Sequence, residues 1–396
     1  MAINELQKID QNKVSCFLFP TTDLTKNQNL MLYLIGIIIT FFLVVILASK
    51  KDKSEADKIL AFWLFFTGFH LFLYYLHYKK DFVSFPFLLG FELPMPLLQG
   101  PFLFLYTSAL TNQNQNRKYN LLHFLPFVLA FLILIPFFSL SFEEKLNVFQ
   151  NEGKGYETTI LILYSAILIS GISYALLSLR KLSKHRKNIS EAFSSIEKIN
   201  LRWLQYLILG SSIIWIVVIL FNDEYIFTFV VFYVIFIGYF GIKQVGIFTN
   251  QTSHQNKIPE VSSVENIKNE NPSEKIKYEK SSLTTSELQV IHQKLTQIME
   301  DEKLYKNPDL TLADLSQKLN IHSNVLSQVI NSAEEKNFYD YINLQRVEEF
   351  KKQILLPENQ KFTLLSVAFE CGFNSKTAFN RNFKKATGLS PSEYLK

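Results

Sequence analysis

The sequence predicts an all-α protein in two parts. The first is a seven-span transmembrane helical domain, and the second is an all-α domain in which a long helix joins two helix-turn-helix units. Two observations support this prediction. Hydrophobic residues make up 48% of the 396-residue chain, with 37 Phe, and they are concentrated in seven long runs before residue 243. After a polar stretch, the apolar residues return with the spacing of amphipathic helices.

The seven apolar runs are each long enough to cross a bilayer, which takes about 20 residues. None has Lys or Arg in its middle, and a soluble protein does not bury seven such helices. Because the first run starts late, we expect it to be retained rather than cleaved, behind an extracytoplasmic segment over residues 1–29. The runs, within a membrane domain expected over 30–242, are 30–48, 59–78, 87–110, 121–140, 158–179, 203–221 and 225–242.

The basic residues of the loops predict the orientation of the chain. The first, third and fifth loops together carry 13 Lys or Arg, and the even-numbered loops carry 4. Cytoplasmic loops carry the excess of positive charge. We therefore expect a multi-pass protein of the bacterial inner membrane, with its N-terminus outside and its C-terminal domain in the cytoplasm.

Glu92 is an acidic residue inside the third run, and an ionisable residue within a span is a functional candidate. Three prolines of the same run surround it, and each removes a backbone donor and bends or breaks a helix. A bilayer tolerates such a break only against protein or a wet cavity. We therefore consider a ligand pocket around Glu92, Gln99 and His70. The alternative is that Glu92 lies near the outer end of its span and reaches water.

No enzyme signature is found in the chain. It has no paired His-x-x-x-His, no GxSxG and no Gly-rich phosphate loop. Its two cysteines, Cys16 and Cys371, provide neither a disulfide framework nor a cysteine metal site. The sequence therefore predicts a protein that is not an enzyme and that needs no cofactor or metal.

Residues 243–280 mark an abrupt change of composition. Residues 251–280 are rich in Ser, Asn, Lys and Glu, and Tyr278 is their single aromatic residue. Such a segment cannot bury enough apolar surface to offset the entropy of ordering it. We expect a flexible cytoplasmic linker. A partly helical stalk is the alternative, and Pro259 and Pro272 argue against it.

Residues 362–396 predict a helix, a tight turn and a second helix. Gly372 tolerates the left-handed backbone that a sharp corner needs, and Ser375 is a suitable N-cap for the helix that follows. Phe379 and Phe383, spaced i and i+4, are expected to face inward, and Gly388 ends the helix. The other faces then carry groups suited to an anion or a base edge: Lys376, Asn380, Arg381 and Lys384.

The first of the two helix-turn-helix units precedes this one in the chain and is expected between residues 281 and 336. Thr284-x-x-Glu287 has the pattern of a capping box, and a second helix runs through LTLADLSQKL. Residues 320–322 make the turn, and Ser323 is expected to cap the third helix, SNVLSQVINS. A long helix over residues 337–355 then joins the two units.

The two units together resemble the DNA-binding domain of AraC-type transcription regulators, over roughly residues 284–396. Asn343 and Arg346 match the connecting helix of that family, whereas Leu395 stands where the family usually has Arg. The resemblance implies two recognition helices that each enter a major groove, about one helical turn apart. It is carried mainly by Ala368, Gly372, Phe373, Ser375, Phe379, Arg381, Phe383, Lys384, Lys385, Gly388, Pro391 and Tyr394.

Charge separates the two units, although the net charge of the chain is only +5. Residues 281–370 hold 9 basic and 13 acidic residues, and residues 371–396 hold 5 and 1. Attraction to phosphate is therefore expected from the second helix-turn-helix unit, with candidate contacts at Ser375, Lys376, Thr377, Asn380, Arg381, Lys384 and Lys385. The first recognition helix has only uncharged candidates, or is a scaffold that barely touches DNA: Ser323, Asn324, Ser327, Gln328 and Asn331.

These observations favour a membrane-embedded, sequence-specific DNA-binding transcription regulator that couples an unknown signal, sensed by the transmembrane domain, to promoter binding. Its expected partners are double-stranded promoter DNA, the lipid bilayer, RNA polymerase, a second copy in a homodimer, and a small-molecule or membrane signal. One alternative is a membrane transporter or channel with a C-terminal autoregulatory DNA-binding domain, and another is a membrane enzyme with a regulatory tail. A variant of the main hypothesis is proteolytic release of the C-terminal domain.

Overall fold

The computed structural model describes residues 23–79, 85–113, 117–151, 153–221, 223–243 and 284–395. These residues are mostly helical and contain no strand, apart from one isolated antiparallel bridge between Phe193 and Thr311. The all-α prediction is confirmed for this part of the chain. The expected linker lies outside the described residues, except for Lys243, and so does most of the expected N-terminal segment.

The chain divides into two compact units, which are described separately below. The first unit contains Met1–Leu182 and Arg202–Asn256, and the second contains Ser183–Leu201 and Lys257–Lys396. The segment Ser183–Leu201, which is the end of one helix and the residues after it, thus interrupts the first unit in sequence and belongs to the second.

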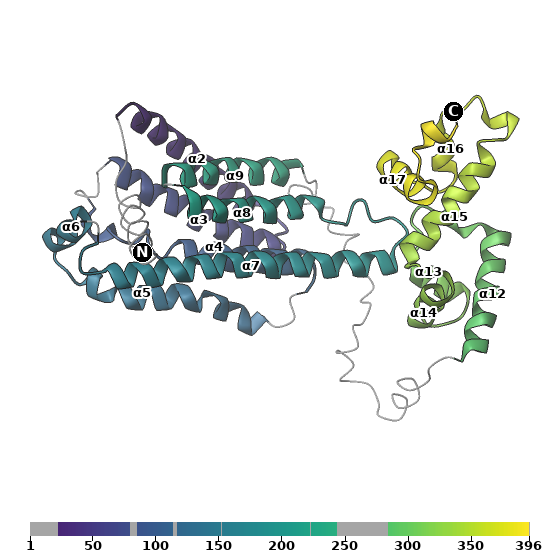
Figure 1. Cartoon of the computed structure of the whole chain (residues 1–396), viewed down its shortest axis with the longest axis horizontal. Helices are drawn as coiled ribbons and strands as arrows, with labels where there is room; N and C mark the ends of the chain where they lie inside the picture. The colour runs from purple at the N-terminus through teal and green to yellow at the C-terminus, as the bar shows by residue number, and fades with distance from the viewer. Residues whose placement is uncertain are drawn as a thin grey trace, which may run out of the picture. The chain divides into compact units, whose positions relative to one another are not determined.

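The first unit is a set of helices. Within it α2 packs against α3 and α9, α3 packs against α4, and α8 packs against α9 (Figure 1). The last residues of α7, from Ser183 onward, belong to the second unit. The helices are α2 (Asp23–Ser49), α3 (Glu55–Lys79), α4 (Pro96–Leu110), α5 (Leu125–Phe138), α6 (Phe142–Gln150), α7 (Glu157–Ala192), α8 (Arg202–Leu220) and α9 (Asp223–Lys243).

The structure has five helices, not seven, that are long and apolar enough to cross a membrane within the residues it describes. They correspond to the first, second, fourth, fifth and sixth expected runs. The seventh run forms α9, but its apolar part, Tyr225–Phe240, is shorter than the others. The five are Leu30–Ser49, Glu55–His77, Tyr119–Phe138, Glu157–Ala192 and Arg202–Leu220.

The third expected run does not form one helix. It divides into a 3-10 turn at Pro86–Leu88, a series of turns, and α4, which has 15 residues. At about 1.5 Å per residue α4 extends about 22 Å, less than the roughly 30 Å of a bilayer core. The physical reason is local: Gly90 has φ +90°, and Pro96 occupies the first position of α4, where a missing N–H is tolerated.

The second unit contains two cores that share one helix. The helix α15 supplies Phe338 and Ile342 to the first core and Val347 and Phe350 to the second. The predicted long connecting helix is therefore confirmed, and it is the structural link between the two helix-turn-helix units. The helices are α12 (Thr285–Glu302), α13 (Leu312–Lys318), α14 (Ser323–Glu334), α15 (Phe338–Gln353), α16 (Leu364–Glu370), α17 (Lys376–Thr387) and α18 (Pro391–Tyr394).

The helix starts confirm one predicted cap and correct another. Thr284 and Glu287 form the predicted capping box, and hydrogen bonds from Thr284 lower the pKa of Glu287. Ser323 does not cap α14: the cap is His322, whose Nδ1 accepts a hydrogen bond from the Asn324 N–H at 3.2 Å. Ser323 is the first residue of the helix, and its hydroxyl lies 2.8 Å from that of Ser316.

Two glycines flank α17 in a left-handed backbone conformation, Gly372 before the helix and Gly388 after it. Gly372 has φ +96°, and a Cβ there would lie 2.3 Å from the Tyr305 carbonyl oxygen. Gly388 has φ +79° with no atom within 4 Å of such a Cβ. The two positions share the backbone strain and differ in steric conflict.

We expect Gly372→Ala to destabilise the second unit by about 3 kcal/mol or more, and Gly388→Ala by about 1 kcal/mol. The measurement is amide hydrogen exchange of the buried α15 amides in the full chain. Equal effects of the two substitutions would contradict the steric conflict at Gly372.

Candidate nucleic-acid interface

The helix α17 is fixed by its cap and by a buried aromatic face. The Ser375 hydroxyl accepts a hydrogen bond from the Ala378 N–H at 3.1 Å, as predicted. The rings of Phe379 and Phe383 are at most 2% exposed and lie 4.7 and 5.5 Å from the ring of Phe350. The opposite side of α17 therefore faces outward, with exposed Lys376, Thr377, Asn380, Lys384 and Lys385.

Arg381 differs from the other candidate contacts because its side chain is only 35% exposed. Its guanidinium donates a hydrogen bond to Glu197 Oε1 at 2.7 Å and another to the Tyr339 hydroxyl. It also lies over the Tyr339 ring, with 5.6 Å between the guanidinium carbon and the ring centroid. Asn382 Nδ2 donates to the same hydroxyl. Arg381 is thus held in a network within the second unit.

Two further candidates have partners of their own. Lys385 lies 2.7 Å from Asp340 Oδ1 and remains 63% exposed, so the pair is a surface ion pair. On α14, the Asn331 amide donates to the Ser327 hydroxyl at 3.3 Å. Neither contact removes the side chains from the surface.

The helix α14 presents an uncharged polar face. Leu326, Val329 and Ile330 are at most 1% exposed, as the spacing predicts. Asn324, Gln328 and Asn331 are exposed, whereas Ser323 and Ser327 are half-buried. Of the five predicted contacts on α14, the three amides are therefore the ones available to a base edge.

Arg346, which the family resemblance singles out, is buried and cannot contact DNA. Its side chain is 1% exposed, and it donates to the carbonyl oxygens of Tyr305 at 2.7 Å, Asn307 at 2.8 Å and Ser194 at 3.0 Å. Burial lowers the pKa of Arg346 to about 10, so the guanidinium stays charged at neutral pH. Its role is to hold the junction between the two helix-turn-helix units.

A buried carboxylate completes this junction. The Glu349 side chain is 3% exposed and lies 2.9 Å from Lys306 Nζ, and it accepts hydrogen bonds from Tyr305 and Gln353. Burial alone raises the pKa of this carboxyl, but the hydrogen bonds from Lys306, Gln353 and Tyr305 outweigh it. The result is a pKa lowered from 4.5 to about 2.

Because the folded pKa of Glu349 is depressed, its contribution to stability is present above pH 4.5 and is lost as the pH falls towards 2. We expect Glu349→Gln to weaken this acid dependence of unfolding of the second unit while lowering stability at pH 7. Urea unfolding of the full chain between pH 7 and pH 3 measures it. An acid limb that Glu349→Gln leaves unchanged would show that other groups cause it.

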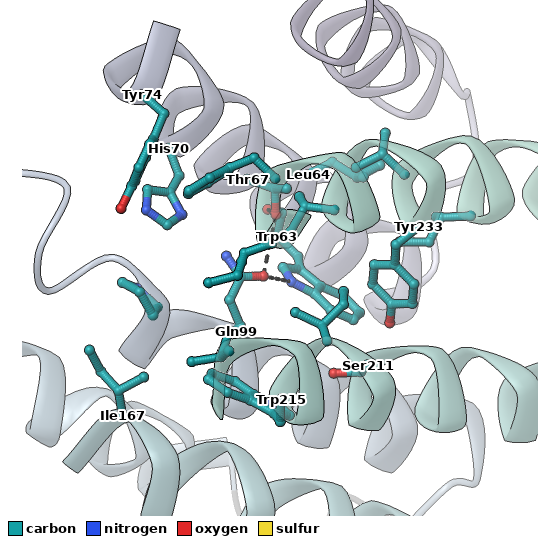
Figure 2. Close-up of a pocket in the computed structure, with 18 of the residues that line it drawn as sticks. Trp63, Leu64, Thr67, His70, Tyr74, Gln99, Ile167, Ser211, Trp215 and Tyr233 are labelled. Carbon is teal, nitrogen blue, oxygen red and sulfur yellow. Dashed lines mark hydrogen bonds between the residues drawn. The ribbon is translucent and has the colours of Figure 1, made fainter. Parts of the chain in front are cut away.

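The first unit encloses a cavity of about 90 Å³ (Figure 2). Gln99 and His70 both line it, as the sequence led us to expect. Gln99 Oε1 accepts a hydrogen bond from Trp63 Nε1 at 2.7 Å and a longer one from Thr67 at 3.4 Å. His70 Nε2 has no hydrogen-bond partner among the described residues.

Glu92 is not among the residues that line the cavity. It is 9% exposed, and its carboxylate accepts a hydrogen bond from the Gly90 N–H at 3.0 Å. The structure therefore places two of the three candidate pocket residues in the cavity lining. Glu92 lies outside the lining, and its backbone hydrogen-bonds with the His70 ring. The Trp63 and Thr67 donors were missed, since nothing in their spacing distinguishes them from ordinary packing residues.

Sequence comparison supports the assignment of the second unit. A family model described as a helix-turn-helix domain matches residues 315–396. Uncharacterized HTH-type transcriptional regulators of Staphylococcus aureus, strains COL and MSSA476, are each 27% identical over 101 residues, which is 26% of this chain and 13% of theirs. The match thus spans about one eighth of the length of these relatives.

The chain is also similar to the solved structure of a protein of unknown function from Listeria innocua. It is 28% identical, covers 26% of this chain and 93% of its own, and has a TM-score of 0.23.

Proposed function

Starting from the AraC-type helix-turn-helix domain at the C-terminal end of the chain, we propose a membrane-embedded transcription regulator that couples a signal received by the first unit to promoter binding. The supporting observation is the outward face of α17. Its lysines and the Asn380 amide stand opposite a buried aromatic face, on a helix held at both ends by a Ser cap and a Gly terminus.

In this proposal DNA binding is shared by the two recognition helices, α14 and α17. Lys376 and Lys384 on α17 are exposed and supply the charge that phosphate contacts need. Asn324 and Gln328 on α14 are exposed but uncharged, and such amides pair with adenine edges in the major groove. In this proposal α17 supplies most of the affinity, and α14 adds base preference.

Placement in a membrane is supported by the outward faces of the apolar helices. On α2, Met31, Ile38, Phe42 and Val45 recur along one face, and each is at least 60% exposed. A continuous apolar face of this kind is costly in water and favourable in lipid. The excess of Lys and Arg in the odd-numbered loops supports a cytoplasmic DNA-binding domain.

The cavity is the proposed site at which the signal is received. Its lining combines apolar and aromatic side chains with a few polar groups, which is typical of small-molecule sites. A buried imidazole nitrogen without a partner is costly unless a ligand or water satisfies it. His70 therefore favours a small, largely apolar molecule that carries one hydrogen-bonding group.

The DNA-binding proposal is tested by the salt dependence of binding. With fragments that the full chain selects from genomic DNA, Lys376→Ala and Lys384→Ala are each expected to weaken binding and to reduce the slope of log affinity against log salt by about one. The control is Lys294→Ala, an exposed lysine on α12, which should leave the slope unchanged. If all three variants bind as the wild type does, α17 does not contact DNA phosphate as proposed.

The orientation is tested with a reporter fused after Lys396. We expect a cytoplasmic readout, since the C-terminal domain has to reach the chromosome. A readout from the opposite side of the membrane would contradict the proposed function as a whole.

A further inference from the structure

A segment between α7 and α8, residues 193–200, packs on the helix-turn-helix domain; we call it the docked segment. It pairs with the start of the first helix-turn-helix unit through the bridge between Phe193 and Thr311 and through the Ser194 N–H, which donates to the Leu310 carbonyl at 3.2 Å. These two contacts place Phe193 and Ser194 of the docked segment beside the backbone of Leu310 and Thr311.

The docked segment is also held by the centre of the domain. The carbonyl oxygen of Ser194 accepts hydrogen bonds from Asn343 Nδ2 and Arg346 Nη1, both at 3.0 Å. The Ser194 hydroxyl oxygen accepts a third hydrogen bond, from Arg346 Nη2, at 3.0 Å. Ser194 is 1% exposed. One residue of the loop is thus buried against the helix that joins the two units.

The third contact of the docked segment is with the recognition helix α17. Asn374 Nδ2, just before the helix, donates to the Ser195 hydroxyl. Glu197 lies 2.7 Å from the Arg381 guanidinium, with its own side chain 16% exposed. Because the Tyr339 hydroxyl is 3.4 Å from the same carboxylate oxygen, Glu197 is fixed in direction as well as in distance.

Arg381 is thereby occupied by a carboxylate. A carboxylate and a phosphate bind a guanidinium through the same donors, so the two compete for one cation. We propose that the docked segment is an autoinhibitory element, in which Glu197 holds Arg381 in place of a DNA phosphate. The docked form then binds DNA more weakly than the released form. This inference rests on the proposed function, because it assumes that α17 faces DNA.

Release of the docked segment leaves no buried charge without partners. Arg346 keeps its hydrogen bonds to the carbonyls of Tyr305 and Asn307 and to Asn343 Oδ1, and water can replace Ser194. The docked segment is continuous in the chain with α7 and α8, two of the helices able to span a membrane. A signal that shifts either helix therefore acts on the docked segment directly, through covalent bonds.

Exposed lysines lie in and near the docked segment: Lys198 within it, and Lys184 and Lys187 in the last turns of α7. These would strengthen attraction to phosphate if the docked segment remained in place on DNA. An autoinhibitory segment predicts that removing the Glu197 charge tightens DNA binding. A segment that assists binding predicts that the same change weakens it, so the sign of the change in affinity decides between the two roles.

The test uses the full chain in lipid nanodiscs and a fluorescent 30-base-pair duplex of mixed sequence. Glu197→Gln keeps the shape of the side chain and removes its charge. We expect it to bind the duplex at least about threefold more tightly and to steepen the salt slope by about one, since one more cation becomes available to phosphate. The added Arg381→Ala substitution should abolish this gain.

The matched control is Glu191→Gln, at the end of α7, which removes the same charge next to the docked segment. Glu191 pairs with Lys187, so this change leaves the pair between Glu197 and Arg381 intact. Equal gains for Glu191→Gln and Glu197→Gln would reduce the effect to net charge and overturn the inference. Weaker binding by Glu197→Gln would overturn it in favour of a docked segment that assists DNA binding. If no variant binds any duplex, the proposed function fails together with the inference.

A second measurement follows the docked segment without relying on affinity. Hydrogen exchange of the peptide that contains Ser194 should be slow in the free chain, because its N–H is bonded to Leu310, and should accelerate when the duplex is added. Unchanged protection in the DNA complex would show that the segment stays docked, and the inference would then be wrong.

Discussion

The second unit depends on one buried guanidinium. Arg346 is almost completely removed from water, and a buried charge is tolerated only when its hydrogen bonds are satisfied. The partners are mainly backbone carbonyls, from the turn after α12, from the segment before α13 and from the docked segment. Carbonyl groups have fixed positions, so a single side chain defines how these three parts of the chain meet. Glycine is needed at position 372 because a Cβ there would lie against the Tyr305 carbonyl oxygen and the Arg346 guanidinium.

Much of the second unit could be predicted from the sequence, because its local signals are strong. The i, i+4 pair Phe379 and Phe383, the cap at Ser375 and the left-handed Gly372 each depend on residues within one turn of chain. The cap of α14 was misassigned by one residue, since His322 and Ser323 are both polar and both precede an apolar helix. Only the geometry distinguishes a side chain that caps from one that packs inside the helix.

The contacts of Glu197 could not be predicted from the sequence. Its partner Arg381 lies 184 positions further along the chain, and no periodicity links residues so far apart. Sequence reasoning also treated Arg381 as a free cation, because a basic residue on the outward side of a helix is usually solvated. Charge counts along a sequence do not reveal which charges are already paired.

The first unit shows a different limit. Composition identified apolar helices but not where they break, so the third run was predicted as a span although Gly90 and Pro96 interrupt it. Of the candidate pocket residues, His70 and Gln99 line the cavity, whereas Glu92, selected for its charge and for the prolines around it, does not. Its carboxylate is satisfied by the backbone of its own turn.

The difference between α14 and α17 has a consequence for the DNA that such a chain would read. One helix offers only amides and hydroxyls, and the other carries lysines, so a single chain has no internal two-fold symmetry. A matching operator would be directional rather than palindromic, with two unlike halves in a fixed order. Inverting it beside a promoter would then present the opposite face of the regulator to the transcription machinery, and the output of the gene would depend on the polarity of the site.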